Sequence, residues 1–106
     1  MRPTHFLQKV SPVTRIEAYR RIHGLTFEQL GERIGRSGFQ AQRYCKPRSD
    51  PKHNRPGWDC AEALDRLTYG VIHAGNYAEE LTLGEAAVMI GELARREAAA
   101  SAGGVA

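Results

Sequence analysis

The sequence predicts an all-α fold of about five helices plus a C-terminal helix. Apolar residues recur at intervals of three and four along successive segments of the 106-residue chain, which is the period of a helix that buries one face. Four of these segments also open with Ser or Thr followed three residues later by Glu or Gln, a capping box that marks a helix start. The boxes are Thr14 with Glu17, Thr26 with Gln29, Ser37 with Gln40, and Thr82 with Glu85.

Length and composition indicate one small folded domain. The chain is long enough to bury a single core, and its apolar content of 42% and charged content of 25% are ordinary for folded proteins. We expect an N-terminal arm over residues 1–11, a folded domain over residues 12–81, a C-terminal helix over residues 82–98 and a disordered tail over residues 99–106. The arm shows no helical period, so we expect it to be frayed.

The first helix is expected to begin near residues 12–14 and to end at Gly24. Pro12 suits the first turn of a helix, and Thr14 can cap it. Glycine readily adopts the left-handed conformation that follows many helices, so Gly24 marks the end. The inner face is predicted from apolar residues at three-residue spacing: Val13, Ile16, Tyr19 and Ile22.

Residues 27–44 have the pattern of two short helices joined by a tight turn. Gly35 stands where a left-handed residue ends the first helix, and Ser37 can cap the second. Gly31 is small enough to let another helix approach closely. The inner faces are predicted from Leu30 and Ile34 in the first helix and from Ala41 and Tyr44 in the second.

Residues 46–57 are predicted to form a loop, because three prolines interrupt a run of otherwise polar residues and glycine. The next helix is expected from about Trp58 to Thr68, and Gly70 breaks it. After it we expect a strand-like turn and a single helical turn. The inner face of the helix is predicted from Trp58, Ala61, Leu64 and Leu67, and the core is expected to be closed by Val71, Ile72 and Tyr77.

The C-terminal helix carries an apolar stripe. Its members alternate steps of four and three, as the seam of a coiled coil does. They are Leu83, Ala87, Ile90 and Ala94. Two interpretations stay open: the stripe packs on its own domain, or it pairs with a second subunit in a homodimer.

The net charge of +3 hides an asymmetry between the two halves of the chain. Residues 1–55 carry twelve Lys and Arg against four Asp and Glu, a net of +8, whereas residues 56–106 carry three against eight, a net of −5. A basic half that contains the paired short helices has the electrostatic pattern of a phosphate-binding surface. A solvated basic face is the plain alternative.

Several function classes find no support in the sequence. No run approaches the ~20 apolar residues of a membrane helix, and the first thirteen residues lack the apolar core of a signal peptide. Neither a phosphate-cradling glycine loop nor a nucleophile motif occurs, and the positions of Cys45, His53, Cys60 and His73 match no common zinc spacing. We therefore expect a cytoplasmic protein with no catalytic residues, no metal, no cofactor and no membrane association.

The spacing within residues 27–44 resembles the helix-turn-helix of the lambda-repressor/Cro-type family. Counting from Phe27, a small residue is fifth, Gly is ninth, and apolar residues are fourth, eighth, fifteenth and eighteenth. In that family the second helix of the pair lies in the major groove of DNA. The resemblance therefore implies a lambda-repressor-like fold that binds double-stranded DNA.

The resemblance extends over residues 13–81. Residues 56–60 and 67–71 are similar to the corresponding parts of small Cro-like and YdaS-like phage regulators, which place a proline and a further helix after the recognition helix. Two features depart from the family. Arg36 stands where an apolar residue is usual, and the loop over residues 46–57 is long.

Base contacts are expected from the second helix of the pair. The residues on or near its outward side are Ser37, Gly38, Phe39, Gln40, Gln42 and Arg43. Arg can bind guanine and Gln can bind adenine by two hydrogen bonds, and Phe can pack on a thymine methyl group. Arg43 is the strongest candidate, and burial over the preceding helix is the alternative for Phe39.

Phosphate contacts are expected from residues around this helix, because such contacts position a protein on DNA without reading sequence. The candidates are Thr26, Gln29, Arg36, Lys46, Arg48, Lys52 and Arg55. The alternative for the loop residues is a solvated linker. A basic N-terminal arm can also reach a minor groove.

These features predict a sequence-specific transcription regulator, of the phage-type repressor kind, that binds a palindromic operator as a homodimer. The alternative is an antitoxin or a protein-interaction module whose acidic C-terminal half binds a protein partner. Salt-dependent DNA binding and co-purification with a partner would distinguish them.

Overall fold

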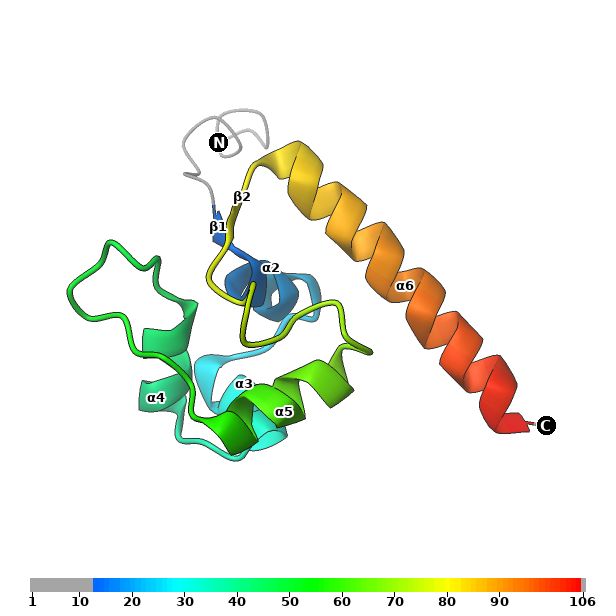
Figure 1. Ribbon diagram of the computed structural model, residues 1–106, viewed down its shortest axis with the longest axis horizontal. Helices are drawn as coiled ribbons and strands as arrows, with labels where there is room; N and C mark the ends of the chain where they lie inside the picture. Colours follow the sequence, from blue (N-terminus) through cyan, green and yellow to red (C-terminus); the bar gives the residue numbers. More distant parts are fainter. Residues whose placement is uncertain (1–12, 106) are drawn as a thin grey trace.

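The computed structural model describes residues 13–105, which are mostly helical, with five helices and a two-stranded sheet (Figure 1). The elements in order are β1 (Val13–Thr14), α2 (Arg15–Ile22), α3 (Phe27–Ile34), α4 (Gly38–Cys45), α5 (Trp58–Leu67), β2 (Glu80–Leu81) and α6 (Leu83–Val105). The mostly helical class predicted from the sequence is confirmed. The predicted N-terminal arm and the last residue of the predicted tail lie outside the described residues.

The core lies between the four short helices and the segment that follows α5. The predicted inward residues of α3 and α4 are buried, and so are the three residues predicted to close the core. They are Leu30, Ile34, Ala41, Tyr44, Val71, Ile72 and Tyr77. Helices of eight to ten residues are marginal in isolation, so burial of this apolar face is what stabilises them.

Three of the four predicted capping boxes are complete. At the starts of α3, α4 and α6 the capping hydroxyl and the Glu or Gln side chain each accept a main-chain hydrogen bond. The box at α2 is half formed: Thr14 Oγ1 accepts from the N–H of Glu17. The Glu17 carboxylate does not return to Thr14 and instead binds Arg20 and Arg21.

The described chain begins as a strand rather than as the first turn of a helix. Thr14 caps α2 in an extended conformation, with φ −67° and ψ 157°, which leaves Val13 in line to pair with β2. The strands are antiparallel, with Val13 opposite Leu81 and Thr14 opposite Glu80. The prediction that Val13 and Ile22 belong to the inner face of the first helix is therefore wrong. Ile22, at the end of α2, is 40% exposed.

The predicted helix after the loop is α5, but its first residue does not join the core. Its inward face is formed by Cys60, Ala61 and Leu64. Trp58 was predicted on that face and is 79% exposed, because it stands at the open end of the helix and to one side of the inward residues. Turns and bends make up most of residues 68–79. Among them, the Tyr77 N–H donates to the main-chain oxygen of His73 at 2.9 Å, which closes the single helical turn predicted there.

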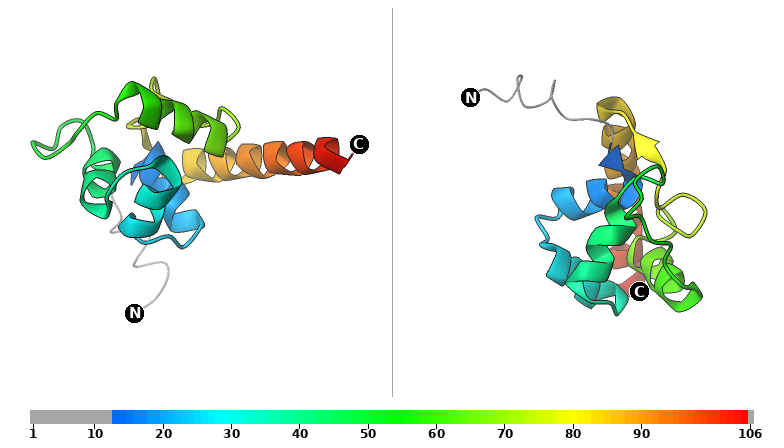
Figure 2. Two further views of the ribbon diagram at one scale, coloured as in Figure 1. Left: turned by 90° about the horizontal axis from the view of Figure 1, so that it is seen from below. Right: turned by 90° about the vertical axis from the view of Figure 1, so that its left-hand side faces the viewer.

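α6 is the longest helix, and its C-terminal end extends beyond the other helices (Figures 1 and 2). It continues past residue 98, where the sequence analysis placed the start of a disordered tail. Composition explains the difference, since residues 98–102 are four alanines and a serine, and alanine has the highest helix propensity. No helix in the described part of the chain is long and apolar enough to cross a membrane.

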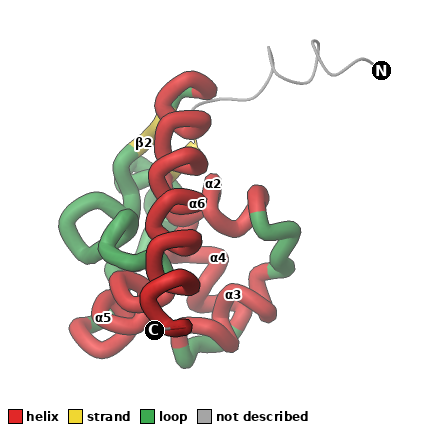
Figure 3. Tube along the Cα trace, turned by 90° about the vertical axis from the view of Figure 1, so that its right-hand side faces the viewer, coloured by secondary structure: helices red, strands yellow, loops and turns green. Residues whose placement is uncertain are grey.

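α6 packs on its own domain, along α2 and β2, but not through the predicted stripe (Figure 3). Met89 and Leu93 are the buried residues of this helix, each 2% exposed. Arg96 adds a hydrogen bond of 2.7 Å from Nη1 to the main-chain oxygen of Tyr69. The stripe itself, comprising Leu83, Ala87, Ile90 and Ala94, faces solvent on the other side.

Candidate nucleic-acid interface

The turn between α3 and α4 is closely packed, and two glycines permit it. A Cβ atom at Gly31 would overlap the main-chain oxygen of Arg36 and lie 2.8 Å from that of Ser37. Gly35 ends α3 at φ +74°, a conformation that strains other residues. The N–H groups of Gly35 and Arg36 both donate to the Gly31 carbonyl. The turn therefore fixes α4 against α3, as the sequence predicted.

Phe39 and Arg43 lie on the side of α4 opposite its buried face, with Phe39 exposed and Arg43 half-buried. Ala41 and Tyr44 face the core, so the residues on the opposite side of the helix point to solvent. Phe39 is 66% exposed, and the Arg43 guanidinium carbon lies 5.1 Å from the centre of its ring. Arg43 Nε is buried and has no hydrogen-bond partner among the described residues, whereas Gln42 beside it is exposed. The structure therefore presents Phe39, Gln42 and Arg43 together, and burial of Phe39 over α3 is not observed.

The other three predicted base contacts have structural roles. Ser37 and Gln40 form the capping box of α4, in which the Ser37 N–H donates to Gln40 Oε1 at 3.2 Å. The side-chain amide nitrogen of Gln40 takes no part in the box and remains a possible donor. Gly38 is half-buried, because a Cβ atom there would lie 2.8 Å from Cγ of Glu28 in α3. These three residues therefore help to position α4.

Thr26 and Gln29 lie at the exposed start of α3. The Thr26 N–H donates to Gln29 Oε1 at 2.9 Å, and the Gln29 N–H donates to Thr26 Oγ1 at 3.1 Å. The start of a helix favours anions, because its peptide dipoles and N–H groups point outward. Both predicted phosphate contacts are thus placed at a suitable end of the helix, with their oxygen atoms already engaged.

Arg36 is tied to α5. Its Nη2 donates to Asp59 Oδ1 at 2.8 Å, and its Nη1 donates to the main-chain oxygen of Gly35 at 2.9 Å. The hydrogen bond from Arg36 holds the pKa of Asp59 below its ordinary value. The guanidinium that was predicted to contact phosphate is therefore occupied by a carboxylate, and it joins the start of α4 to the start of α5.

The long loop is anchored beside the end of α4. The Asn54 N–H donates to the main-chain oxygen of Arg43 at 3.2 Å. His53 Nδ1 lies 2.7 Å from the main-chain oxygen of Lys46, so Nδ1 is the donor. In the neutral ring, Nε2 then accepts from the Tyr77 hydroxyl, also at 2.7 Å. Residues 46–57 are thus a shaped loop, and Figure 2 shows it on the same side of the molecule as α4.

Tyr77 connects this loop to the core, and the sequence analysis missed that role. Its ring is fully buried, and the Arg48 guanidinium carbon lies 5.2 Å from the ring centre. Burial raises the pKa of Tyr77, although the nearby charges of Arg48 and Arg55 oppose the shift. The sequence offered one indication of this role, which was His53 in an otherwise solvated loop. Tyr77 lies 24 residues away, however, and no spacing rule predicts that the two residues are in contact.

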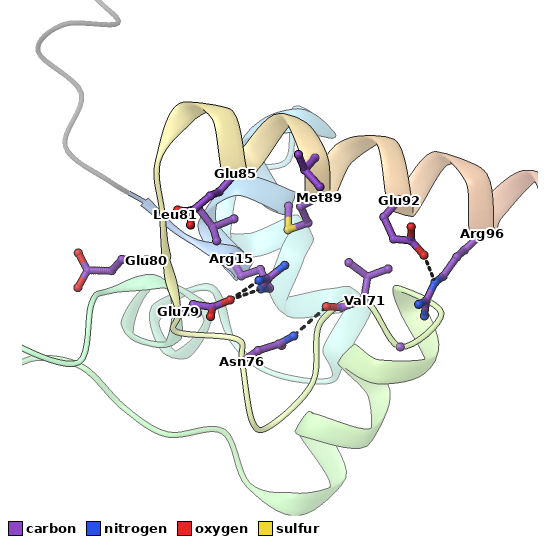
Figure 4. Close-up of a pocket in the computed structure, with 12 residues that line it drawn as sticks. Arg15, Val71, Asn76, Glu79, Glu80, Leu81, Glu85, Met89, Glu92 and Arg96 are labelled. Carbon is purple, nitrogen blue, oxygen red and sulfur yellow. Dashed lines mark hydrogen bonds and ion pairs between the residues drawn. The ribbon is translucent and has the colours of Figure 1, made fainter.

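A cavity lies between α6, β2 and the turns after α5 (Figure 4). The cavity measures about 530 Å³ and includes the apolar side chains of Val71, Leu81 and Met89. Four acidic residues also line it: Glu79, Glu80, Glu85 and Glu92. Arg15 pairs with Glu79 and Arg96 with Glu92, which leaves this acidic groove with a net negative lining.

Metal and thiol chemistry gain no support from residues 13–105. No three His, Cys, Asp or Glu side chains gather there closely enough to hold a metal ion. Cys45 and Cys60 are both buried free thiols, and burial raises the pKa of each.

No protein-family model, curated protein or solved structure matches this chain. The resemblance to the lambda-repressor/Cro-type family therefore stays a prediction, and the function is argued from geometry and charge.

Proposed function

We propose that this protein is a sequence-specific DNA-binding regulator of transcription with a lambda-repressor-like fold, of the phage-type repressor kind. α3 and α4 act as its helix-turn-helix, and α4 is the recognition helix that enters the major groove. The protein binds a palindromic operator as a homodimer, with the two recognition helices about one DNA turn (~34 Å) apart.

The distribution of ion pairs carries this proposal. Seven described arginines bind a carboxylate within the protein: Arg15, Arg20, Arg21, Arg36, Arg66, Arg95 and Arg96. Five basic residues between α4 and the start of α5 have no such partner among the described residues: Arg43, Lys46, Arg48, Lys52 and Arg55. Unneutralised cations beside an exposed helix suit a ligand that carries a regular row of negative charges.

In this proposal α4 contacts the bases of DNA, and the loop over residues 46–57 contacts its phosphates. Arg43 can donate to O6 and N7 of guanine, Gln42 can bind adenine, and the Phe39 ring can pack on a thymine methyl group. The loop cations neutralise phosphates and fix the register of the helix in the groove. The hydrogen bonds between His53 and both Lys46 and Tyr77 hold this loop in place in the free protein, which lowers the entropy cost of binding DNA.

The experiment compares two arginine variants on two duplexes. The operator duplex is an inverted repeat to be identified in the DNA upstream of the gene, and the second duplex is a scrambled sequence of the same composition. Affinity is measured by fluorescence anisotropy. Arg43→Ala should cost ~1–3 kcal/mol on the operator and relax the preference at one base pair per half-site. Arg48→Ala should weaken both duplexes equally. Arg66→Ala is the control, because this exposed arginine already pairs with Glu62 on α5.

The opposite assignment would show a different pattern. If Arg43→Ala weakens both duplexes equally while Arg48→Ala changes base preference, the loop reads the sequence and α4 only holds the backbone. If wild-type protein binds neither duplex at low salt, the proposal of DNA binding fails as a whole.

The acidic groove favours a second candidate function, that of an antitoxin or protein-interaction module. Its apolar floor and net negative lining suit a basic amphipathic segment of another protein. Glu85→Lys should weaken co-purification of such a partner and leave DNA binding unchanged, because Glu85 lies on α6, which Figure 1 shows on the opposite side of the molecule from α4. A partner retained by this variant would contradict binding at the groove.

A further inference from the structure

The side of α6 that faces away from its own domain carries an uncharged strip. Six exposed residues form it, and we call it the outer face of α6: Leu83, Ala87, Ile90, Ala94, Ala98 and Ser101. Leu83 is 65% exposed and Ile90 is 37% exposed. A solvated helix usually carries charged residues on its outward side, so an uncharged outer face of this length indicates a binding surface.

Side-chain size changes along the outer face. The bulky members, Leu83 and Ile90, lie in the first half of the helix. The second half offers only small side chains, at Ala94, Ala98 and Ser101. One half of the face is therefore raised and the other is hollowed, and the two halves have complementary shapes.

The last turns of α6, from residue 98 onward, lack support from their own domain. The last described contacts are the bond from Arg96 to Tyr69 and the 3.7 Å approach of His23 Nε2 to Glu97 Oε2. Every side chain over residues 98–102 is exposed. A short unsupported helix is marginal in water, so this part of α6 would gain order from a partner.

We propose that the outer face of α6 binds the outer face of α6 in a second copy of the chain, with the two helices antiparallel. Leu83 then lies against the partner's Ala98 and Ala87 against the partner's Ala94, while Ile90 lies near the twofold axis. The raised half of each helix fills the hollowed half of the other, which keeps the helices evenly spaced. The inference rests on the homodimer of the proposed function and adds its surface and direction.

Three features select this partner and direction. The outer face is complementary to itself, and a twofold contact of this kind closes after two subunits. A parallel pair would set Leu83 against Leu83 and Ala98 against Ala98, which would force the helices apart at one end and leave a void at the other. Antiparallel packing also aligns the two helix dipoles favourably.

Cysteine cross-linking tests the pairing without DNA, so its failure is distinct from failure of DNA binding. Ala87→Cys and Ala94→Cys are oxidised separately and as a mixture, with one variant carrying a mass tag. The native thiols do not interfere, because Cys45 and Cys60 are 6% and 1% exposed. We expect a disulfide between the tagged and untagged chains in the mixture and little product from either variant alone. Ala100→Cys, exposed on the opposite side of the same helix, is the control and should not cross-link.

Two results would overturn the inference. Efficient cross-linking of Ala87→Cys with itself would show a parallel pair, and a mixture that gives no product would exclude this register and surface. Sedimentation supplies a second measurement: Ile90→Asp should shift the protein from dimer to monomer, while circular dichroism stays unchanged because Ile90 is not a core residue of its own domain. A folded Ile90→Asp variant that remains dimeric would also contradict the pairing.

Discussion

The hydroxyl of Thr14 donates a hydrogen bond of 2.7 Å to the main-chain oxygen of Cys45, 31 residues further along the chain. The same oxygen atom accepts from the Glu17 N–H, so one buried side chain caps α2 and also binds the last residue of α4. This bond sets the position of the proposed recognition helix relative to α2 and β1.

Thr14→Val should therefore lower the free energy of unfolding by roughly 2–4 kcal/mol, because it removes a helix cap and leaves the buried Cys45 carbonyl without its partner. Thr14→Ser keeps the hydroxyl and should retain most of the stability. Urea denaturation followed by circular dichroism measures both. A Val variant within 0.5 kcal/mol of wild type would show that this bond contributes little.

Gly31→Ala should destabilise the protein by roughly 1–3 kcal/mol, since the added methyl group would meet the main-chain oxygens of Arg36 and Ser37. Gly84→Ala is the matched control, because a Cβ atom there would meet nothing within 4 Å and alanine favours the helix. It should stabilise α6 slightly. Equal unfolding midpoints for the two variants would contradict the close approach of α3 and α4.

The stability of the protein should depend on pH through Glu17. Burial raises the pKa of this carboxyl, but the hydrogen bonds and charges of Arg20 and Arg21 outweigh burial and hold it below its usual value of 4.5. The ionised carboxylate therefore contributes stability above about pH 4.5, and this contribution is lost as the pH falls through the lowered pKa of the folded state.

Glu17→Gln should accordingly cost roughly 1–3 kcal/mol at pH 7, and its difference from wild type should shrink as the pH is lowered toward 3. Urea titrations at several pH values measure this. Glu32→Gln, at an exposed position of α3, is the control and should follow wild type. A Glu17→Gln deficit that does not change with pH would reflect packing rather than ionisation.

Local signals in the sequence predicted the helical segments well. Capping residues and glycines act through neighbours within a few positions, so the starts of α3 and α4 and the turn between them follow from spacing alone. Burial of Leu30, Ile34 and Tyr44 followed from the same helical period. The fold class, and the exposure of Phe39 and Gln42 on α4, were therefore predictable.

Features that depend on distant partners were not predictable. The pairing of Val13 with Leu81 and the contact of His53 with Tyr77 join residues far apart in the sequence. The apolar stripe on α6 is evident in the sequence, but the helix has a second apolar face, and spacing alone does not show which of the two packs on the domain. Met89 and Leu93 form the one that meets the domain. Arg36 was predicted to contact phosphate, but its guanidinium binds Asp59, which lies 23 residues further along the chain.

The central claim is that the loop cations beside α4 bind the phosphates of DNA. Counterion release makes such binding fall linearly with salt on logarithmic axes, with a slope of about −0.9 for each phosphate neutralised. The direct measurement is the affinity of wild type for the operator duplex at several salt concentrations between 50 and 200 mM, repeated with Arg48→Ala. We expect a steep slope that Arg48→Ala reduces by about one. A flat salt response in wild type, or no binding at 50 mM salt, would contradict the account.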